Sequence, residues 1–465
     1  MNTLTALFLD AVGAFFFCYL LFYATYLFLS VTAGAWRLYQ QERMRRIKNE
    51  IKHPFYFPVS ILVPAHNEEI TILDSVQSLI DLDYRLYEII VIDDGSSDKT
   101  TELLVDHFHM RRVDKPIRRV LRCQAQEAVY EAAGTRVPLT LIRKQNGGKG
   151  DALNMGINAA QYPYFLCIDA DSMLQRDSLE RIVQPAMEDD TVVAVGGLIR
   201  AAQCLRRHED GSVSYHLPWN PVISTQVLEY DRSFLASRIL MDSFNGNLII
   251  SGAFGLFHKS TVVAAGGYDP DTLGEDMELV MKLHVFCRTN RIPYSIRYEP
   301  GAVCWSQMPT TLRDLHKQRR RWHLGLFQSM MKYRYIFLRP RYGAVGSLSY
   351  LYYLLFELFS PPIQLVGLIS LLIAWGAGLL NASFMVGFYL LYAGYGAVLS
   401  LTAFFQRIYT QNLKISGGDV AKACVMCVLE SGFFRFVLDF FRMTAFVGYR
   451  KGRRRWGQIK RRKMS

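Results

Sequence analysis

The sequence lacks the glycine-rich motifs of two large nucleotide-binding classes. It contains no G-x-G-x-x-G, and Lys149 in NGGKGD has neither the earlier glycine nor the following Ser or Thr of a P-loop. Dinucleotide chemistry and ATP hydrolysis are therefore not expected. The eight cysteines form no disulfide framework, and Cys424 and Cys427 lie in an apolar segment, where packing is a simpler interpretation than a metal or redox site. Internal repeats and low-complexity linkers are also absent from the sequence.

Charge is absent from two long stretches of the chain and scarce in a third. No charged residue occurs from Ala11 to Trp36 or from Phe384 to Phe405, and Tyr350 to Leu380 contains only Glu357. Each stretch is long enough for the roughly 20 residues that cross a bilayer core, so we expect three membrane spans. A cleaved signal peptide does not fit the first stretch, which has no basic start and no clear cleavage site. We interpret it as a retained anchor.

A fourth apolar segment, from Ala421 to Gly448, carries charge along its length. Charged side chains at mid-membrane are costly, so these must face protein, water or the membrane interface. Basic residues follow the first span and a basic tail ends the chain, and the positive-inside rule places both in the cytoplasm. Both placements agree only if the fourth segment does not fully cross, so we expect an interfacial or re-entrant helix there. Its charged residues are Lys422, Glu430, Arg435, Asp439 and Arg442.

Much of the excess behind the net charge of +12 lies beside the hydrophobic segments. Lys and Arg near a membrane are attracted to anionic headgroups by about 1 kcal/mol each, so we expect a lipid bilayer rather than nucleic acid as the partner. Between the membrane segments the composition is that of a soluble α/β domain. The expected division is an anchor with a basic juxtamembrane helix (1–50), a cytoplasmic α/β domain (51–325), an interfacial amphipathic segment (326–347), a membrane region (348–448) and a basic cytoplasmic tail (449–465).

Acidic residues follow apolar stretches at two points of the α/β domain. Asp93 and Asp94 end EIIVIDD, and the DxD of Asp169 and Asp171 ends YFLCIDAD. Parallel βαβ units bind ligands at the carboxyl ends of their strands. Helix capping also explains such acidic turns. A DxD on an extended backbone would instead point both carboxylates to one side, where Mg²⁺ could join them to substrate phosphates.

Two further motifs lie toward the end of this domain. In TLGED, Glu275 and Asp276 are expected at a helix start, where they either interact with the helix dipole or supply a general base. In QRRRW, Trp322 offers either an aromatic face for stacking or an interfacial anchor. We interpret its neighbours Arg319 and Arg320 as solvated or lipid-facing charges. The hydrophilic stretch of residues 206–216 has no assignment.

Taken in order, these motifs resemble those of membrane-bound processive family 2 glycosyltransferases, which include poly-N-acetylglucosamine, cellulose and hyaluronan synthases. The likeness runs from Val59 to Trp322 and also includes NGGKGDALN, SGAFGLF and GGYD. SGAFGLF and TLGEDMEL are most similar to the bacterial poly-N-acetylglucosamine-synthase-like branch. The resemblance implies an α/β, Rossmann-like GT-A domain flanked by transmembrane and interfacial helices.

The resemblance also implies roles for single residues. Asp276 matches the general base, with Glu275 beside it, and Asp169 and Asp171 match a site for Mg²⁺ or Mn²⁺. The implied nucleotide pocket consists of Ala65, Asn67, Glu68, Asp94, Lys149 and Asp169. The implied acceptor and diphosphate site consists of Gln318, Arg321 and Trp322.

The activity implied is inverting polymerisation of a UDP-sugar, UDP-glucose or UDP-N-acetylglucosamine, into a β-linked exopolysaccharide at the bacterial inner membrane. The growing polysaccharide would be the acceptor, and its synthesis would be coupled to export. A homo-oligomer or a small membrane subunit is an expected partner, because few spans are available to line a channel. Two alternatives remain at this point: transfer of a single sugar to a membrane lipid, and an inactive membrane scaffold or pore.

Overall fold

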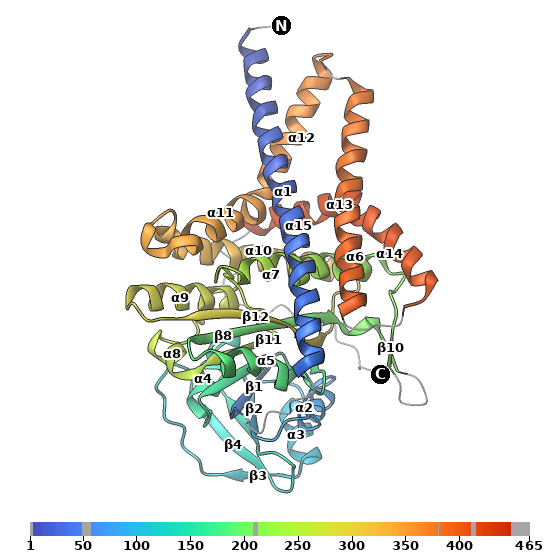
Figure 1. Ribbon diagram of the computed structural model, residues 1–465. Coiled ribbons are helices and arrows are strands. Elements are labelled where there is room, and N and C mark those ends of the chain that lie inside the picture. Colours follow the sequence, from blue (N-terminus) through green and yellow to red (C-terminus); the bar gives the residue numbers. More distant parts are fainter. Residues whose placement is uncertain (1–2, 49–56, 208–212, 380, 411–414, 448–465) are drawn as a thin grey trace.

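The computed structural model describes residues 3–48, 57–207, 213–379, 381–410 and 415–447. The expected basic tail of residues 449–465 lies outside these ranges, as does the middle of the unassigned stretch, residues 208–212. The two ends of that stretch pair as an antiparallel hairpin, β9 (Leu205–Arg207) with β10 (Val213–Tyr215). A domain built around a large sheet forms one end of the molecule, and long helices project from the other (Figure 1).

A ten-stranded sheet forms the centre of the domain. Strands β5, β2, β1 and β6 run parallel to one another, as the βαβ pattern predicts, and β8 pairs in parallel with β12. Antiparallel β11 lies between β6 and β8 and joins the two groups. In spatial order the strands are β3 (Met110–Val113), β4 (Gln126–Ala132), β5 (Leu139–Lys144), β2 (Tyr87–Asp93), β1 (Val59–Ala65), β6 (Tyr164–Ile168), β11 (Phe254–His258), β8 (Val192–Ala201), β12 (Ser295–Ser306) and β7 (Ser172–Leu174).

Helices cover both faces of this sheet, which explains why its central strands are mostly apolar and buried along their whole length. Successive residues of β1 enter different cores: Ile61 and Val63 pack in one apolar cluster and Leu62 in the other. The helices of the domain are α2 (Ile72–Ile80), α3 (Thr100–His107), α4 (Lys149–Ala159), α5 (Ser178–Glu188), α8 (Lys259–Ala264) and α9 (Glu275–Thr289). The parallel strands end at one edge, and the motif loops start there.

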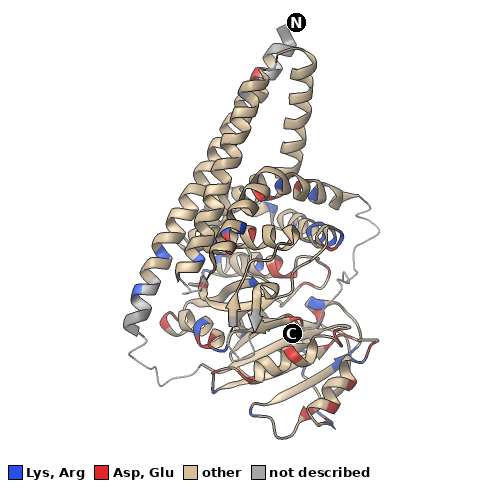
Figure 2. Ribbon diagram, turned by 90° about the vertical axis from the view of Figure 1, so that its right-hand side faces the viewer, with Lys and Arg blue, Asp and Glu red and all other residues tan. Residues whose placement is uncertain are grey.

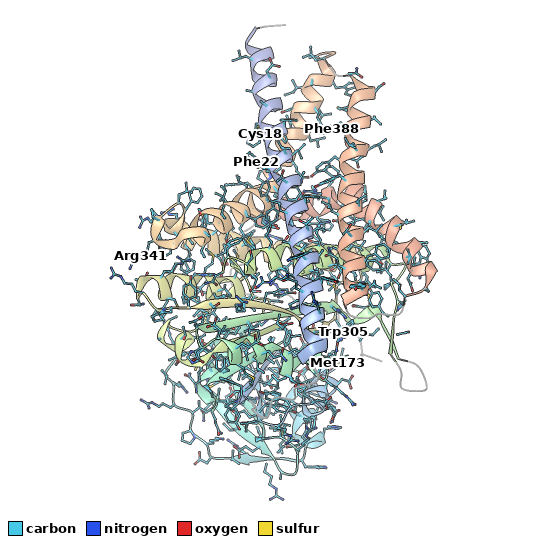
Figure 3. All side chains as sticks on the ribbon, in the orientation of Figure 1. Cys18, Phe22, Met173, Trp305, Arg341 and Phe388 are labelled. Atoms are coloured by element: carbon cyan, nitrogen blue, oxygen red, sulfur yellow. The ribbon has the colours of Figure 1, made fainter. Side chains whose placement is uncertain are left out.

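Three helices project away from the domain: α1 (Thr3–Lys48), α12 (Ser360–Gly376) and α13 (Ala382–Thr410) (Figure 1). Their projecting parts are almost free of charged residues, and most charges of α1 lie toward its C-terminal end (Figure 2). Cys18, Phe22 and Phe388 lie on their exposed surface (Figure 3). Among the described residues, 10–40 and 385–409 are long and apolar enough to cross a membrane.

A third span is formed if two helical segments on either side of Phe359 are counted together. They are Val345–Leu358 and Ser360–Gly376, which meet at an angle of 50°. Pro361 and Pro362 cause the break, because proline starts a helix readily but cannot continue the hydrogen bonding of a preceding one.

The charged apolar segment forms α14 (Gly417–Leu429), a π-helical turn (Glu430–Phe434) and α15 (Arg435–Met443). These elements lie across the base of the projecting helices rather than beside them (Figure 1). Nearby, α6 (Pro221–Arg232), α7 (Arg238–Asp242) and α10 (Leu312–Lys332) form a layer between the sheet and the projecting helices (Figure 1). The expected domain boundary at residue 325 falls inside α10, because the helical spacing of apolar residues continues beyond QRRRW.

Candidate active site

One cavity of about 1250 Å³ lies between the carboxyl edge of the sheet, α9, α10 and the base of the projecting helices. Residues far apart in the sequence line it together. Those with a role implied above are Glu68, Lys149, Asp169, Asp171, Glu275, Asp276, Gln318, Arg321 and Trp322. The three acidic and basic motifs therefore face the same space.

The DxD motif lies on a turn between β6 and β7. The N–H of Ser172 donates to the carbonyl oxygen of Asp169 at 3.0 Å, which closes the turn. The expectation of an extended backbone was wrong, because β6 already ends at Ile168. Both carboxylates nevertheless line the cavity, Asp169 about one-third exposed and Asp171 buried. The two carboxylates therefore line one cavity, as expected, but a turn rather than an extended strand places them there.

Lys149 begins α4 and reaches across the cavity wall to the DxD. Its Nζ lies 2.6 Å from Asp169 Oδ1, 3.4 Å from Glu275 Oε1 and 3.2 Å from the Gly252 carbonyl oxygen. Burial opposes the charge of this ammonium group, but Asp169 and Glu275 outweigh burial and raise its pKa. Lys149 is thus held as a cation between two acidic motifs.

The GED motif lies at a helix start, as predicted. Gly274 precedes α9, and Glu275 and Asp276 occupy its first turn. The N–H of Gly252 donates to Asp276 Oδ2 at 3.2 Å, which fixes the Asp276 carboxylate in the cavity wall. Burial raises the pKa of Glu275, and nearby Lys149 opposes that rise. Glu275 and Asp276 therefore lie where the helix dipole stabilises them and also line the cavity, so the two interpretations of the GED motif do not exclude each other.

QRRRW lies in the middle of α10. Gln318, Arg321 and Trp322 are spaced i, i+3 and i+4, so they share the helix face that lines the cavity. Trp322 is 40% exposed, an open aromatic surface within the cavity. The ring of Tyr230, which also lines the cavity, lies next to it, and the two ring centroids are 6.3 Å apart.

The interpretation of Arg319 as a solvated or lipid-facing charge was wrong. The side chain is 4% exposed and forms a bidentate pair with Glu229 at 2.9 and 2.6 Å. Its guanidinium lies 4.7 Å from the centre of the Trp322 ring. Arg320 is more exposed and donates to the carbonyl oxygen of Val447. The Arg319 guanidinium therefore packs against the Trp322 ring, and the helical spacing alone does not reveal this contact.

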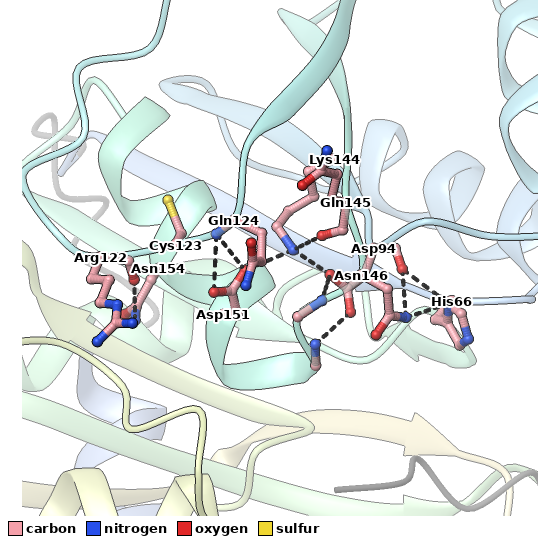
Figure 4. A network of polar contacts seen from close by, with 12 residues as sticks. His66, Asp94, Arg122, Cys123, Gln124, Lys144, Gln145, Asn146, Asp151 and Asn154 are labelled. Atoms are coloured by element: carbon pink, nitrogen blue, oxygen red, sulfur yellow. Dashed lines mark hydrogen bonds and ion pairs between the residues drawn. The ribbon is translucent and has the colours of Figure 1, made fainter.

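Three residues of the implied nucleotide pocket are not part of the cavity lining. Ala65 is buried in β1, and the backbone N–H of Asn67 donates to Ser96 Oγ at 3.0 Å. Asp94 is fully buried and accepts from the N–H groups of Gly147 at 3.0 Å and Gly148 at 2.7 Å (Figure 4). It holds the loop that carries Lys149. Their direct contact with a nucleotide stays a prediction.

Sequence reasoning missed Lys144, the partner of Asp94. Its fully buried ammonium group pairs with Asp94 and lies 2.7 Å from Asp151 Oδ1 (Figure 4). Asp151 also accepts from the N–H of Gln124 at 3.1 Å. The available signal was a lysine at the end of the strand LTLIRK, directly before the glycine-rich loop. The network makes that loop a rigid support.

Sequence reasoning also missed the wall of the cavity nearest the projecting helices. Tyr23 and Tyr26 of α1 contribute to it, together with charged residues of α15 and the π-helical turn. Glu430 is buried and forms a bidentate pair with Arg232 at 2.9 Å in both contacts. The prediction that the charges of this segment face protein, water or the interface is confirmed for Glu430, which faces protein. The cavity thus extends from the DxD to the helices that project from the domain.

Comparison with known proteins identifies the family. The profile of the glycosyl transferase family group 2 matches residues 164–404, and that of glycosyl transferase family 2 matches residues 60–133. The chain is a family 2 glycosyltransferase. The prediction of an enzyme of this family is confirmed, and so is the GT-A-like α/β fold.

This glycosyltransferase is similar to poly-beta-1,6-N-acetyl-D-glucosamine synthases. It is 30% identical to that of Staphylococcus aureus (strain COL) over 323 residues, 68% of this chain and 67% of the relative. The Staphylococcus epidermidis enzyme is 29% identical over 68% of this chain and 66% of its own. The mannosyltransferase PcManGT from Pyrobaculum calidifontis, solved with GDP-Man and Mn²⁺, has a TM-score of 0.51 at 20% identity, covering 89% of this chain and 98% of its own, which shows a shared fold.

The donor atoms of the glycosyltransferase cavity suit a divalent cation that arrives with phosphates. Among the described residues, no three His, Cys, Asp or Glu side chains converge into a complete metal site. Mg²⁺ is typically held by only one or two carboxylates with substrate phosphates, and Asp169 and Asp171 could supply these. The carboxylates of the DxD and GED motifs, four in all, line the cavity together with Lys149 and Arg321. Negative charge exceeds positive charge among these groups, and a divalent cation fits that excess.

Proposed function

We propose that this glycosyltransferase polymerises a UDP-sugar, UDP-glucose or UDP-N-acetylglucosamine, into a β-linked exopolysaccharide. The observation that carries this proposal is the single cavity that joins the DxD, GED and QRRRW motifs to the base of the projecting helices. The 30% identity to a poly-beta-1,6-N-acetyl-D-glucosamine synthase supports N-acetylglucosamine as the sugar and a polymer as the product.

The proposed reaction is a single inverting displacement. An acceptor hydroxyl attacks the anomeric carbon opposite the diphosphate, and the new C–O bond forms as the bond to the phosphate oxygen breaks. UDP leaves with that electron pair, and an α-linked donor becomes a β-linked product. Asp276 takes the proton of the hydroxyl, since a base within hydrogen-bond reach is required. The Gly252 N–H at 3.2 Å holds the Asp276 carboxylate for this task.

Charge stabilisation of the departing diphosphate falls to the DxD carboxylates and to two cations of the cavity lining. Asp169 and Asp171 would hold a divalent cation, which supplies positive charge at the leaving phosphates. Arg321 contributes a planar guanidinium suited to bidentate contact with phosphate, and Lys149 supplies a second positive charge. Glu68 lies in the same cavity, on the side of β1, and is assigned to the nucleotide.

The acceptor is assigned to the α10 side of the cavity. Trp322 presents the open aromatic face on which a sugar ring stacks, and its indole N–H is a donor for a hydroxyl. Gln318 lies one turn earlier on the same face and adds amide donors and acceptors. Arg319 supports this placement, because its bidentate pair with Glu229 fixes the guanidinium that packs against the Trp322 ring.

Beyond Trp322 we assign the cavity to the growing polymer, coupling synthesis to export. Its continuation to Tyr23, Tyr26 and the α15 residues supports this path, because aromatic and hydrogen-bonding groups suit a neutral sugar chain. We place the enzyme in the bacterial inner membrane as a multi-pass protein with its sheet domain in the cytoplasm. With two or three candidate spans among the described residues, a second copy or a small membrane subunit would complete a channel wall.

The test is incubation of the purified, membrane-embedded protein with UDP-glucose or UDP-N-acetylglucosamine, with UDP release measured and the product sized. The proposal predicts a long polymer from one of the two donors. A lipid carrying a single sugar would favour the non-processive alternative. UDP release from neither donor, in a protein that still binds UDP, would favour an inactive scaffold.

A further inference from the structure

The contacts of Lys149 point to a function beyond nucleotide binding. An ammonium group has three donors, and three acceptors surround this one: Asp169 Oδ1 at 2.6 Å, Glu275 Oε1 at 3.4 Å and the Gly252 carbonyl oxygen at 3.2 Å. The shortest contact is to a carboxylate of the DxD. A cation therefore already occupies one side of the carboxylate that is assigned to the divalent ion.

We propose that Lys149 acts as an internal counter-ion that occupies Asp169 until a metal–nucleotide complex arrives, and so prevents the metal from binding first. This inference rests on the proposed function, because it takes Asp169 and Asp171 as the metal ligands. Lys149 lowers the affinity of the empty site for a free divalent cation in two ways. It competes for Asp169 Oδ1, and its charge repels a second cation at close range.

Release of Lys149 from Asp169 leaves the ammonium group with two of its acceptors. Glu275 and the Gly252 carbonyl remain in place, so the group stays in the cavity wall and can turn toward the incoming diphosphate. Gly252 leaves room for the ammonium group beside the GED carboxylates. A Cβ at that position would lie 3.0 Å from Lys149 Nζ and 3.4 Å from Asp276 Cβ.

Gly252 also contacts the proposed base. Its carbonyl oxygen accepts from Lys149 while its N–H donates to Asp276 Oδ2 at 3.2 Å. The two contacts lie on the same short backbone segment. Gly252 therefore supports both the counter-ion Lys149 and the proposed base Asp276, so the two side chains are held by one residue.

The experiment measures Mn²⁺ binding to the full-length protein without any nucleotide, by electron paramagnetic resonance of the free ion. Lys149→Gln should bind Mn²⁺ at least about tenfold more tightly than the wild type, because the competing charge is removed. Lys149→Met, which keeps the apolar stem, should do the same and serves if the first variant does not fold. Lys149→Arg keeps the charge and should stay close to the wild type.

Two controls separate this effect from general electrostatics. Lys282 also lines the cavity but contacts Glu278 at 3.2 Å and the Gly267 carbonyl oxygen at 2.6 Å. Lys282→Gln removes the same charge and should leave Mn²⁺ affinity within about twofold of the wild type, because it contacts neither DxD carboxylate. With UDP present, Lys149→Gln should bind Mn²⁺ no more tightly than the wild type.

Unchanged or weaker nucleotide-free Mn²⁺ binding in both Lys149→Gln and Lys149→Met would overturn the proposal, as would an equal gain in Lys282→Gln. Adding Asp169→Asn to Lys149→Gln should abolish the gain, and a gain that persists would also overturn it. The assay contains no sugar donor. Failure to make a polymer would therefore refute the proposed function and leave this result standing.

Discussion

The contact between Gly325 and Gly274 gives a sharp test of how the site is assembled. Gly325 lies in α10, one turn after QRRRW, and Gly274 precedes the GED carboxylates. A Cβ on Gly325 would lie 2.7 Å from both Cα and N of Gly274 and 3.1 Å from the carbonyl carbon of Leu273. These are backbone atoms, so no side chain can rotate out of the way. Gly325→Ala must separate α10 from the GED loop.

The size of the separation follows from the same distances. A contact of 2.7 Å must open to about 3.4 Å to become an ordinary van der Waals contact, and overpacking of this kind costs about 1–3 kcal/mol of stability. Trp322 and Arg321 then move away from Asp276 by a large fraction of an ångström. Because a misplacement of 1 Å can cost about 100-fold in rate, we expect Gly325→Ala to lower kcat by about 10- to 100-fold.

The assay is the rate of UDP release by the purified variant, together with its UDP affinity and melting temperature. UDP affinity should fall less than kcat, because Lys149, Asp169 and Asp171, the other proposed contacts of the diphosphate and its cation, lie outside α10. Gly394→Ala is the matched control: this glycine is also helical, but no atom lies within 4 Å of the position that its Cβ would take, so activity should be retained. A Gly325→Ala protein with wild-type kcat would refute the argument that this contact sets the distance between the two motifs.

Three further predictions follow from other contacts. Asp171→Ala should weaken UDP binding in the presence of Mn²⁺ by about tenfold or more but not in its absence, and titration calorimetry showing equal affinities would contradict the DxD assignment. Arg319→Met breaks the bidentate pair with Glu229, whose second cation, Arg442, lies 3.8 Å away, and should cost about 1–3 kcal/mol, measured as a lower melting temperature. Arg319→Met with Glu229→Gln should recover part of this loss, and no loss in the single variant would contradict the pairing. Burial raises the pKa of Glu299 from 4.5 to about 7, so the stability that its protonated form contributes is fully present below pH 4.5 and is lost as the pH rises through 7. Glu299→Gln should gain about 2 kcal/mol of stability relative to the wild type between pH 5 and pH 8, and parallel stability curves would contradict this.

The motif order predicted the edge of the sheet at which the site lies. Asp94, Asp169 and Lys149 each follow or precede a parallel strand, and parallel strands end at one edge. The local backbone was less predictable. The turn at the DxD depends on where β6 stops, and antiparallel β11 between β6 and β8 is a long-range pairing with no local signal.

The partners of charged side chains were the least predictable part. Arg319 is followed directly by Arg320 and Arg321, so its sequence context suggests solvent, yet its partner Glu229 comes from a helix 90 residues earlier. Asp94 carries a motif that implies nucleotide contact, yet it is covered by Lys144 and the Gly147–Gly148 loop. Pairings of this kind depend on tertiary packing, which the order of residues along the chain does not encode locally.

The most direct test of the central claim is UDP release by Asp276→Asn. Asparagine keeps an oxygen that can accept from the Gly252 N–H, so the side chain stays in place and only the proton acceptor is lost. We predict that UDP release falls by at least about 100-fold while UDP affinity with Mn²⁺ stays within about twofold of the wild type. Normal turnover by Asp276→Asn would remove this carboxylate from the mechanism and contradict the account of the cavity as the site of sugar transfer.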